Sequence, residues 1–159
     1  MATALDLAQS RTYPFPIEQA FAFTLPVPLP AVFSRWFGPL PPVVETTGHE
    51  VWGTVGQTRN VRTADGGTMR EQLVTVDPPN RFAYELTEVT GPLKALVASI
   101  DGSWNFESVG TGTRIEWAWT IHPTSRVAEI VLPAIGLLWN GYARRALDRL
   151  DHLMVTELG

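Results

Sequence analysis

Three residues of the chain have side chains suited to acid–base chemistry inside a fold: Arg59, Glu71 and Tyr84. A guanidinium group can stabilise the negative oxygen of an enolate, and a carboxylate or a phenol can move a proton. An arginine stays charged in almost any environment, so a buried one needs an acidic partner, which Glu71 can provide. These three are the candidate catalytic residues, provided that the strands around them bring them to one face.

The register of the predicted strands decides whether these side chains meet. A four-residue loop over 77–80 places Glu71 on the same face as Tyr84. For the preceding hairpin, a two-residue turn pairs Arg59 with Gln72, whereas a three-residue loop with a bulged glycine pairs it with Glu71. We favour the second register, because a slip by one residue would turn the whole set to the other face. A structural ion pair at the sheet edge and a tyrosine bonded to the backbone are the plainer alternatives.

Aromatic residues are the second group that points to a site. The chain has six tryptophans among 159 residues. A single tryptophan is more often plain core, but four that converge indicate a cavity with aromatic walls. The same register arguments pair Trp104 with Trp117 and predict one cavity of several hundred cubic ångströms. The candidate ligand-binding residues are Gln57, Trp104, Trp117, Trp119, Trp139 and Tyr142.

The elements that must position these residues follow from periodicity and turn signals. Strands with alternating polarity and short turns predict an antiparallel meander, and steps of three and four predict a helix at the end of the chain. The expected class is α+β, in one domain over 1–159. In order, we expect a tail over 1–9, an edge strand over 11–16, short helices over 16–25 and 29–37, strands over 43–121 and a long helix over 124–157.

The long helix has an ambiguous first half. Thr124 or Ser125 can cap it, and Pro133 predicts a kink or a break. The predicted inward stripe consists of Val127, Val131, Ile135, Leu138, Tyr142, Ala146, Leu150 and Leu153. No charge occurs between residues 130 and 143, so apolar side chains also point away from this stripe. Cover by the short N-terminal helices, a homodimer contact and a lip that touches a membrane are the three explanations for the outward Leu137.

Composition excludes several classes of function. A net charge of −4 argues against nucleic-acid binding, which rests on a basic surface. Without cysteine there is no disulfide or thiolate chemistry, and His49, His122 and His152 lack the spacing of metal ligands. No signal peptide or membrane span is visible. We expect a cytoplasmic protein with no metal, no cofactor and no stable membrane insertion.

The order of elements resembles the helix-grip fold shared by START domains, Bet v 1 allergens and bacterial polyketide cyclase/dehydrase-like proteins. The segments that carry the resemblance are 13–21, 76–86, 110–117 and the closing helix. The resemblance implies a curved antiparallel sheet wrapped around a long C-terminal helix, with two short helices after the first strand and a hydrophobic cavity between sheet and helix. It transfers no catalytic residue, since these proteins share a cavity and no catalytic motif.

Two functions from different classes remain open at the level of sequence, and a protein-interaction module that uses the cavity mouth is a third option. The first is a cofactor-independent cyclase or dehydratase that orients a polyketide-like or aromatic substrate against the aromatic walls. The second is a non-catalytic carrier or sensor of a lipid, sterol, quinone or similar apolar molecule. Both require a small hydrophobic or aromatic ligand, and only the first requires a titratable group inside the cavity.

Overall fold

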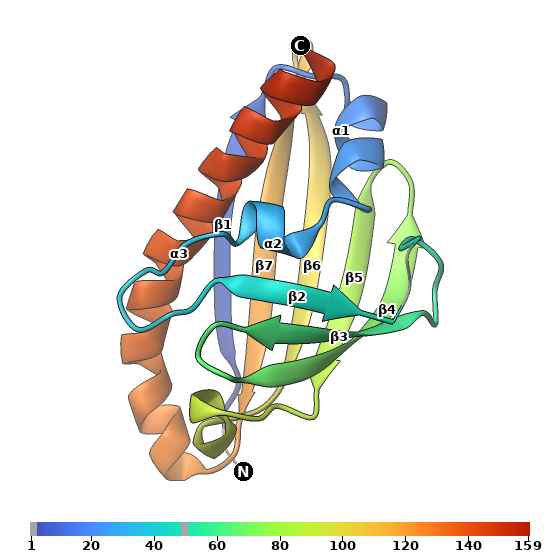
Figure 1. Ribbon diagram of the computed structural model, residues 1–159. Helices are drawn as coiled ribbons and strands as arrows, with labels where there is room; N and C mark the ends of the chain where they lie inside the picture. Colours follow the sequence, from blue (N-terminus) through green and yellow to red (C-terminus); the bar gives the residue numbers. More distant parts are fainter. Residues whose placement is uncertain (1–2, 49–50) are drawn as a thin grey trace.

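The computed structural model describes residues 3–48 and 51–159. Figure 1 shows a single curved sheet with a long helix running across it. The elements in chain order are β1 (Leu5–Tyr13), α1 (Ile17–Thr24), α2 (Leu29–Val32), β2 (Val43–Thr47), β3 (Thr58–Thr63), β4 (Thr68–Asp77), β5 (Arg81–Thr87), η1 (Pro92–Ala95), β6 (Val97–Val109), β7 (Gly112–Pro123) and α3 (Arg126–Leu158).

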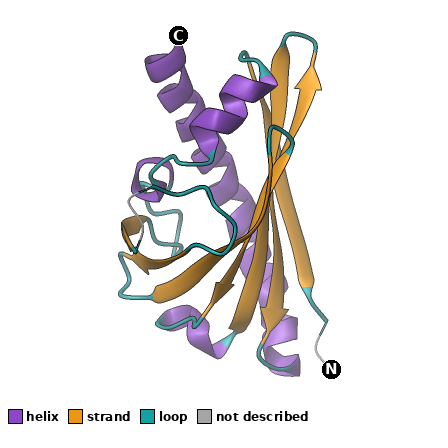
Figure 2. Cartoon of the chain, turned by 90° about the vertical axis from the view of Figure 1, so that its right-hand side faces the viewer, coloured by secondary structure: helices purple, strands orange, loops and turns teal. Residues whose placement is uncertain are grey.

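The seven strands form one antiparallel sheet in the order β1-β7-β6-β5-β4-β3-β2. Strands β2 and β3 run nearly crosswise to β1, β7 and β6, so the sheet curls strongly (Figure 1). In the view of Figure 2, α3 lies along one face of the sheet. The predicted α+β class and the helix-grip arrangement are both confirmed. None of the helices described here combines the length and the apolar character that a membrane crossing requires.

The N-terminal segment departs from its prediction. Strand β1 begins at Leu5, so residues 5–9 are part of the sheet and the predicted tail over 1–9 was wrong for them. Leu5 pairs with Ile121, and the pairing continues to Tyr13 opposite Thr113. Leu5 and Leu7 pack against the core while Asp6 accepts a hydrogen bond from Thr120. Residues 5–9 are few and mixed in polarity, so their sequence alone does not predict a strand. Their pairing with β7 shows that they form one.

The strand registers that matter for the site are confirmed. Arg59 pairs with Glu71, and Gly66 has the positive φ of +87° that the three-residue loop requires. Farther along, Leu73 pairs with Tyr84 as predicted. The route to that pairing differs, because Asp77 already pairs with Arg81 and a bulge between Leu73 and Thr75 compensates for the shorter loop. The shorter loop and the bulge therefore cancel, and Glu71 lies on the predicted face of the sheet.

The long helix uses a different face from the predicted one in its first half. Ser125 caps it by accepting a hydrogen bond from the Ala128 N–H, and the helix continues through Pro133 without a break. Its buried residues are Ala128, Leu132, Gly136, Trp139, Ala143, Ala146, Leu147, Leu150 and Met154. Val127 and Val131, which were assigned to the inward stripe, are exposed. Gly136 packs closely on β1, since a Cβ there would lie 3.0 Å from Leu7 Cδ2 and the leucine side chain would have to shift.

We call Val127, Ile130, Val131 and Leu137 the outer face of α3. Leu137 is 75% exposed, so within the described residues the short N-terminal helices do not cover it. The second of those helices is also shorter than predicted: α2 ends at Val32, where the prediction ran to residue 37. An uncharged, exposed face of this kind is unusual for an isolated surface helix.

Candidate functional site

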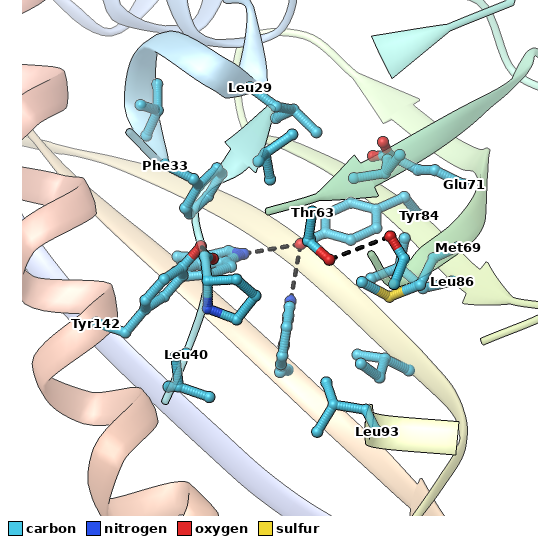
Figure 3. Close-up of a pocket in the computed structure, with 18 of the residues that line it drawn as sticks. Leu29, Phe33, Leu40, Thr63, Met69, Glu71, Tyr84, Leu86, Leu93 and Tyr142 are labelled. Carbon is cyan, nitrogen blue, oxygen red and sulfur yellow. Dashed lines mark hydrogen bonds between the residues drawn. The ribbon is translucent and has the colours of Figure 1, made fainter. Parts of the chain in front are cut away.

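A cavity of about 120 Å³ lies between the concave side of the sheet, the α2 region and α3. It is smaller than the several hundred cubic ångströms predicted, and aromatic side chains make up much of its wall. Its walls are almost entirely apolar, and Figure 3 shows side chains from α2, the strands and α3 pointing into it. Arg59, Glu71, Tyr84, Trp104, Trp117, Trp119, Trp139 and Tyr142 all line it, as the sequence predicted.

The most polar part of the cavity wall is the pair Arg59–Glu71. The Arg59 Nε donates a hydrogen bond of 2.7 Å to Glu71 Oε1, and the side chains are only 7% and 5% exposed. The guanidinium carbon lies 4.0 Å from the centre of the Trp52 ring, which adds a cation–π contact. The arginine is therefore held on two sides, and the pair presents a fixed charge distribution to the cavity.

Burial raises the pKa of Glu71, and the positive charge and hydrogen bond of Arg59 only partly oppose this. The ordinary glutamate pKa is about 4.5. A raised pKa means that the folded protein holds this proton more tightly than the unfolded chain does. The contribution of Glu71 to stability is therefore fully present below that ordinary value, and it is lost as the pH rises through the raised pKa.

This shift predicts an observable pH dependence. Glu71→Gln keeps an acceptor for Arg59 and cannot ionise, so the variant should gain stability relative to the parent as the pH rises. Urea unfolding of both proteins between about pH 5 and pH 8 measures the difference. A stability difference between parent and variant that stays constant over this window would show that the pKa of Glu71 is not raised.

The Tyr84 hydroxyl is the centre of a second polar group. Its oxygen accepts hydrogen bonds from Trp117 Nε1 at 2.8 Å and from Trp119 Nε1 at 2.9 Å. Both bonds are drawn as dashed lines in Figure 3. Burial raises the pKa of Tyr84 far above its ordinary range, and the nearby charge of Glu71 adds to this effect. Tyr84 is therefore a neutral phenol at physiological pH.

Gly102 makes this arrangement possible. Tyr84 on β5 pairs with Gly102 on β6, which in turn pairs with Trp119 on β7. The tyrosine ring passes over the glycine to reach the indoles one strand farther on. A Cβ at Gly102 would fall well inside the van der Waals radius of the ring carbons and the hydroxyl oxygen of Tyr84. A glycine in a strand interior often marks such a close approach, and that signal was available in the sequence.

Stacked rings form the remaining wall. Trp104 stacks on Trp117 with ring centres 5.6 Å apart, and Trp139 lies 4.8 Å from Trp117. On the other side, Phe33 stacks on Tyr142 at 5.8 Å. The Tyr142 hydroxyl donates to the backbone oxygen of Pro41, which fastens the segment after α2 to α3. Residues 29–37 were predicted only as a short helix, and Phe33 was missed as part of the site.

Gln57 does not belong to the site, contrary to the prediction. Its amide oxygen accepts from the backbone N–H groups of Gly53 and Thr54, and its amide nitrogen donates to the oxygen of Val51. Gln57 lies just before β3 and its side chain stabilises a local turn. The rule that side chains alternate between the two faces of a strand therefore did not apply to it. Trp52, which the turn brings over Arg59, was missed for the same reason.

The histidines of the described residues each lie near one carboxylate. No group of three or more histidine, aspartate or glutamate side chains gathers in the described part of the chain in a way that could hold an ion. His122 lies 2.7 Å from Asp101 and His152 lies 3.7 Å from Asp148, both on the surface. His49 falls outside the described residues.

Comparisons with known proteins agree with this architecture. The chain resembles the crystal structure of Ara h 8.0201 with a TM-score of 0.64 and 13% identity, covering 98% of this chain and 100% of that one. A solution structure from Arthrobacter aurescens matches with a TM-score of 0.68 and 15% identity, over 96% and 87% of the two chains. The crystal structure of a protein from Bacillus thuringiensis matches with a TM-score of 0.63 and 18% identity, covering 95% of this chain and 99% of that one. At these identities the likeness shows the fold alone.

Comparison with curated protein sequences found no match. A family model does match, over residues 4–155, and it therefore covers nearly all of the elements that build the cavity. Its description is polyketide cyclase / dehydrase and lipid transport. The chain belongs to this family.

Proposed function

We propose that the protein binds a small, flat, mostly apolar molecule in the cavity between sheet and α3. The observation that carries this proposal is the wall itself, in which stacked aromatic rings surround a space of about 120 Å³ with few polar atoms. An apolar cavity of about 150 Å³ is known to bind benzene. A single aromatic ring or a short branched chain fits the present volume, and a larger ligand would need additional space.

Binding of toluene tests this proposal. Because four tryptophans line the cavity, their fluorescence should change with toluene concentration and reach saturation. Val61→Phe should abolish the effect, since Val61 is a buried cavity residue and the larger ring fills the space. Val74→Phe is the matched control, because Val74 is exposed at the bulge of β4. No saturable change in the parent protein would contradict a ligand site.

A second candidate function is the cofactor-independent cyclase or dehydratase chemistry considered above. The raised pKa of Glu71 supports it, since a carboxyl group that exchanges its proton nearer to neutral pH is a better acid and base. In the loss of water from a β-hydroxyketone, Glu71 would take the proton next to the carbonyl and return it to the departing hydroxide. Arg59 would stabilise the enolate oxygen.

The two candidates separate in an assay with 4-hydroxy-4-phenylbutan-2-one. A dehydratase forms the conjugated enone, which is followed by its ultraviolet absorbance, and Glu71→Gln should abolish turnover while toluene binding survives. A carrier binds the ketone and leaves it unchanged. Binding without turnover would therefore favour the carrier or sensor of an apolar molecule.

The assembly state and the location in the cell stay predictions. A homodimer through the outer face of α3 predicts sedimentation coefficients that rise with protein concentration. Leu137→Glu should then restore monomers without loss of folding, because this side chain is exposed. A parent protein that sediments as a monomer at all concentrations would contradict the dimer. We also expect the protein to be cytoplasmic.

A further inference from the structure

Two hydrogen-bond donors at the aromatic wall lack an acceptor among the residues that the structure describes. The Tyr84 oxygen accepts two indole N–H groups, so its own proton must be donated elsewhere, and none of the hydrogen bonds among residues 3–48 and 51–159 provides an acceptor for it. Trp139 Nε1 is likewise buried without a partner in the described structure. Buried polar groups are nearly always paired, because leaving them unpaired costs stability. Two such donors in one cluster require an explanation.

Both donors belong to the same end of the cavity. The Trp139 ring lies 4.8 Å from that of Trp117 and 5.7 Å from that of Trp119, the two indoles that hold Tyr84. Trp139 comes from α3, whereas the other three residues come from the sheet. The aromatic wall therefore offers hydrogen-bond donors at its centre and has no free acceptor among these four side chains.

We propose that the cavity selects a neutral aromatic ligand that carries a carbonyl oxygen, such as an aryl ketone, an aryl aldehyde or a quinone, and that Tyr84 and Trp139 donate to that oxygen. This inference rests on the proposed ligand-binding function. A carbonyl oxygen has two lone pairs and no hydrogen to donate, which matches two donors without a free acceptor.

Other ligand groups match the cluster less well. A hydroxyl or an amine would bring a proton for which the doubly hydrogen-bonded Tyr84 oxygen has no remaining capacity. A carboxylate would add a second negative charge near Glu71, whose partner Arg59 is already engaged at 2.7 Å. Burial of an unpaired charge is far more costly than burial of a carbonyl group. The two indole bonds also polarise the phenol, and a polarised O–H is a stronger donor.

A pair of ligands with the same shape tests the inference. Acetophenone and α-methylstyrene differ only in that a carbonyl oxygen is replaced by a CH₂ group. We expect the parent protein to bind the ketone about tenfold more tightly, the difference that one well-placed hydrogen bond makes. The infrared band of the bound ketone should shift to lower frequency, because hydrogen bonds to the oxygen weaken the C=O bond.

Variants connect this preference to the two donors. Tyr84→Phe and Trp139→Phe should each reduce the band shift and the ratio of the affinity for the ketone to the affinity for α-methylstyrene. Tyr13→Phe is the control: Tyr13 is also a buried tyrosine, but its hydroxyl donates to Leu147 O, away from the cavity lining. If Tyr84→Phe does not fold, the band shift in the parent protein and the Trp139→Phe variant still decide the question.

The outcomes separate this inference from the proposed function. Binding of both probes with equal affinity and an unshifted carbonyl band would overturn the carbonyl inference and leave ligand binding intact. That result would also indicate that buried water satisfies the donors. Failure of both probes to bind would overturn both proposals. Tighter binding of the ketone that Tyr84→Phe and Trp139→Phe leave unchanged would refute the assignment to these residues.

Discussion

Arg59→Ala is expected to lower the free energy of unfolding by about 3–5 kcal/mol, because it leaves Glu71 buried without its partner. Both side chains are nearly inaccessible, at 7% and 5% exposure. Urea unfolding at neutral pH measures the change. Arg62 on the same strand provides the control. It forms an ion pair with Glu45, and the two side chains are 52% and 51% exposed. Arg62→Ala should cost only about 0–1 kcal/mol.

A double replacement distinguishes a buried charge from simple loss of packing. Arg59→Met combined with Glu71→Leu removes both charges and keeps most of the side-chain volume. Replacing a buried ion pair by apolar residues is often neutral or stabilising. The double variant should therefore be much more stable than Arg59→Ala. Equal destabilisation by the two changes would mean that the loss comes from packing against Trp52 and not from the unpaired carboxylate.

Gly102→Ala should also lower the free energy of unfolding, in this case for steric reasons. The new methyl group would occupy space that the Tyr84 ring now fills, so either the ring or strand β6 must move. Overpacking of this kind costs about 1–3 kcal/mol, and displacement of Tyr84 also removes the acceptor of two indole donors. We expect a large drop in stability and a loss of near-ultraviolet circular dichroism from the tryptophans.

The control for this change is Gly53→Ala, where the added Cβ would lie at an ordinary distance of 3.4 Å from Leu25. It should be tolerated. A second replacement, Tyr84→Leu in the Gly102→Ala background, removes the ring and should recover part of the lost stability. A Gly102→Ala variant as stable as the parent would show that Tyr84 does not need to cross β6 in this way.

The sheet and its polar pair could be predicted because they depend on local signals. Turn residues and alternation along each strand determine which side chains share a face, so Arg59 opposite Glu71 followed from the loop that ends at Gly66. The predicted pairing of Leu73 with Tyr84 is correct despite the unexpected bulge near Val74, because the shorter loop at residue 77 compensates for it. Pairings of adjacent strands through short loops are thus accessible from sequence.

Features that depend on distant segments could not be predicted in the same way. The first half of α3 is apolar all round, and its buried face includes Gly136, which packs closely on Leu7 of the distant strand β1. Phe33 and Tyr142, more than a hundred residues apart, stack on each other in the cavity wall. Gln57 was misplaced because its side chain serves a local turn. Hydrophobic periodicity identifies the apolar faces of an element, but it does not tell which other element each face packs against.

The order of strands has a consequence for how the chain reaches its native state. From β2 to β7 every strand pairs with its neighbour in sequence, so these contacts form hairpin by hairpin. Strand β1 pairs with β7 instead, and its Tyr13 and Arg11 are bonded to Leu147 and Asp148 of α3. Loops of this length close slowly. During synthesis, β1 therefore stays unpaired until β7 has emerged, and an unpaired strand edge exposes a growing chain to aggregation during this interval.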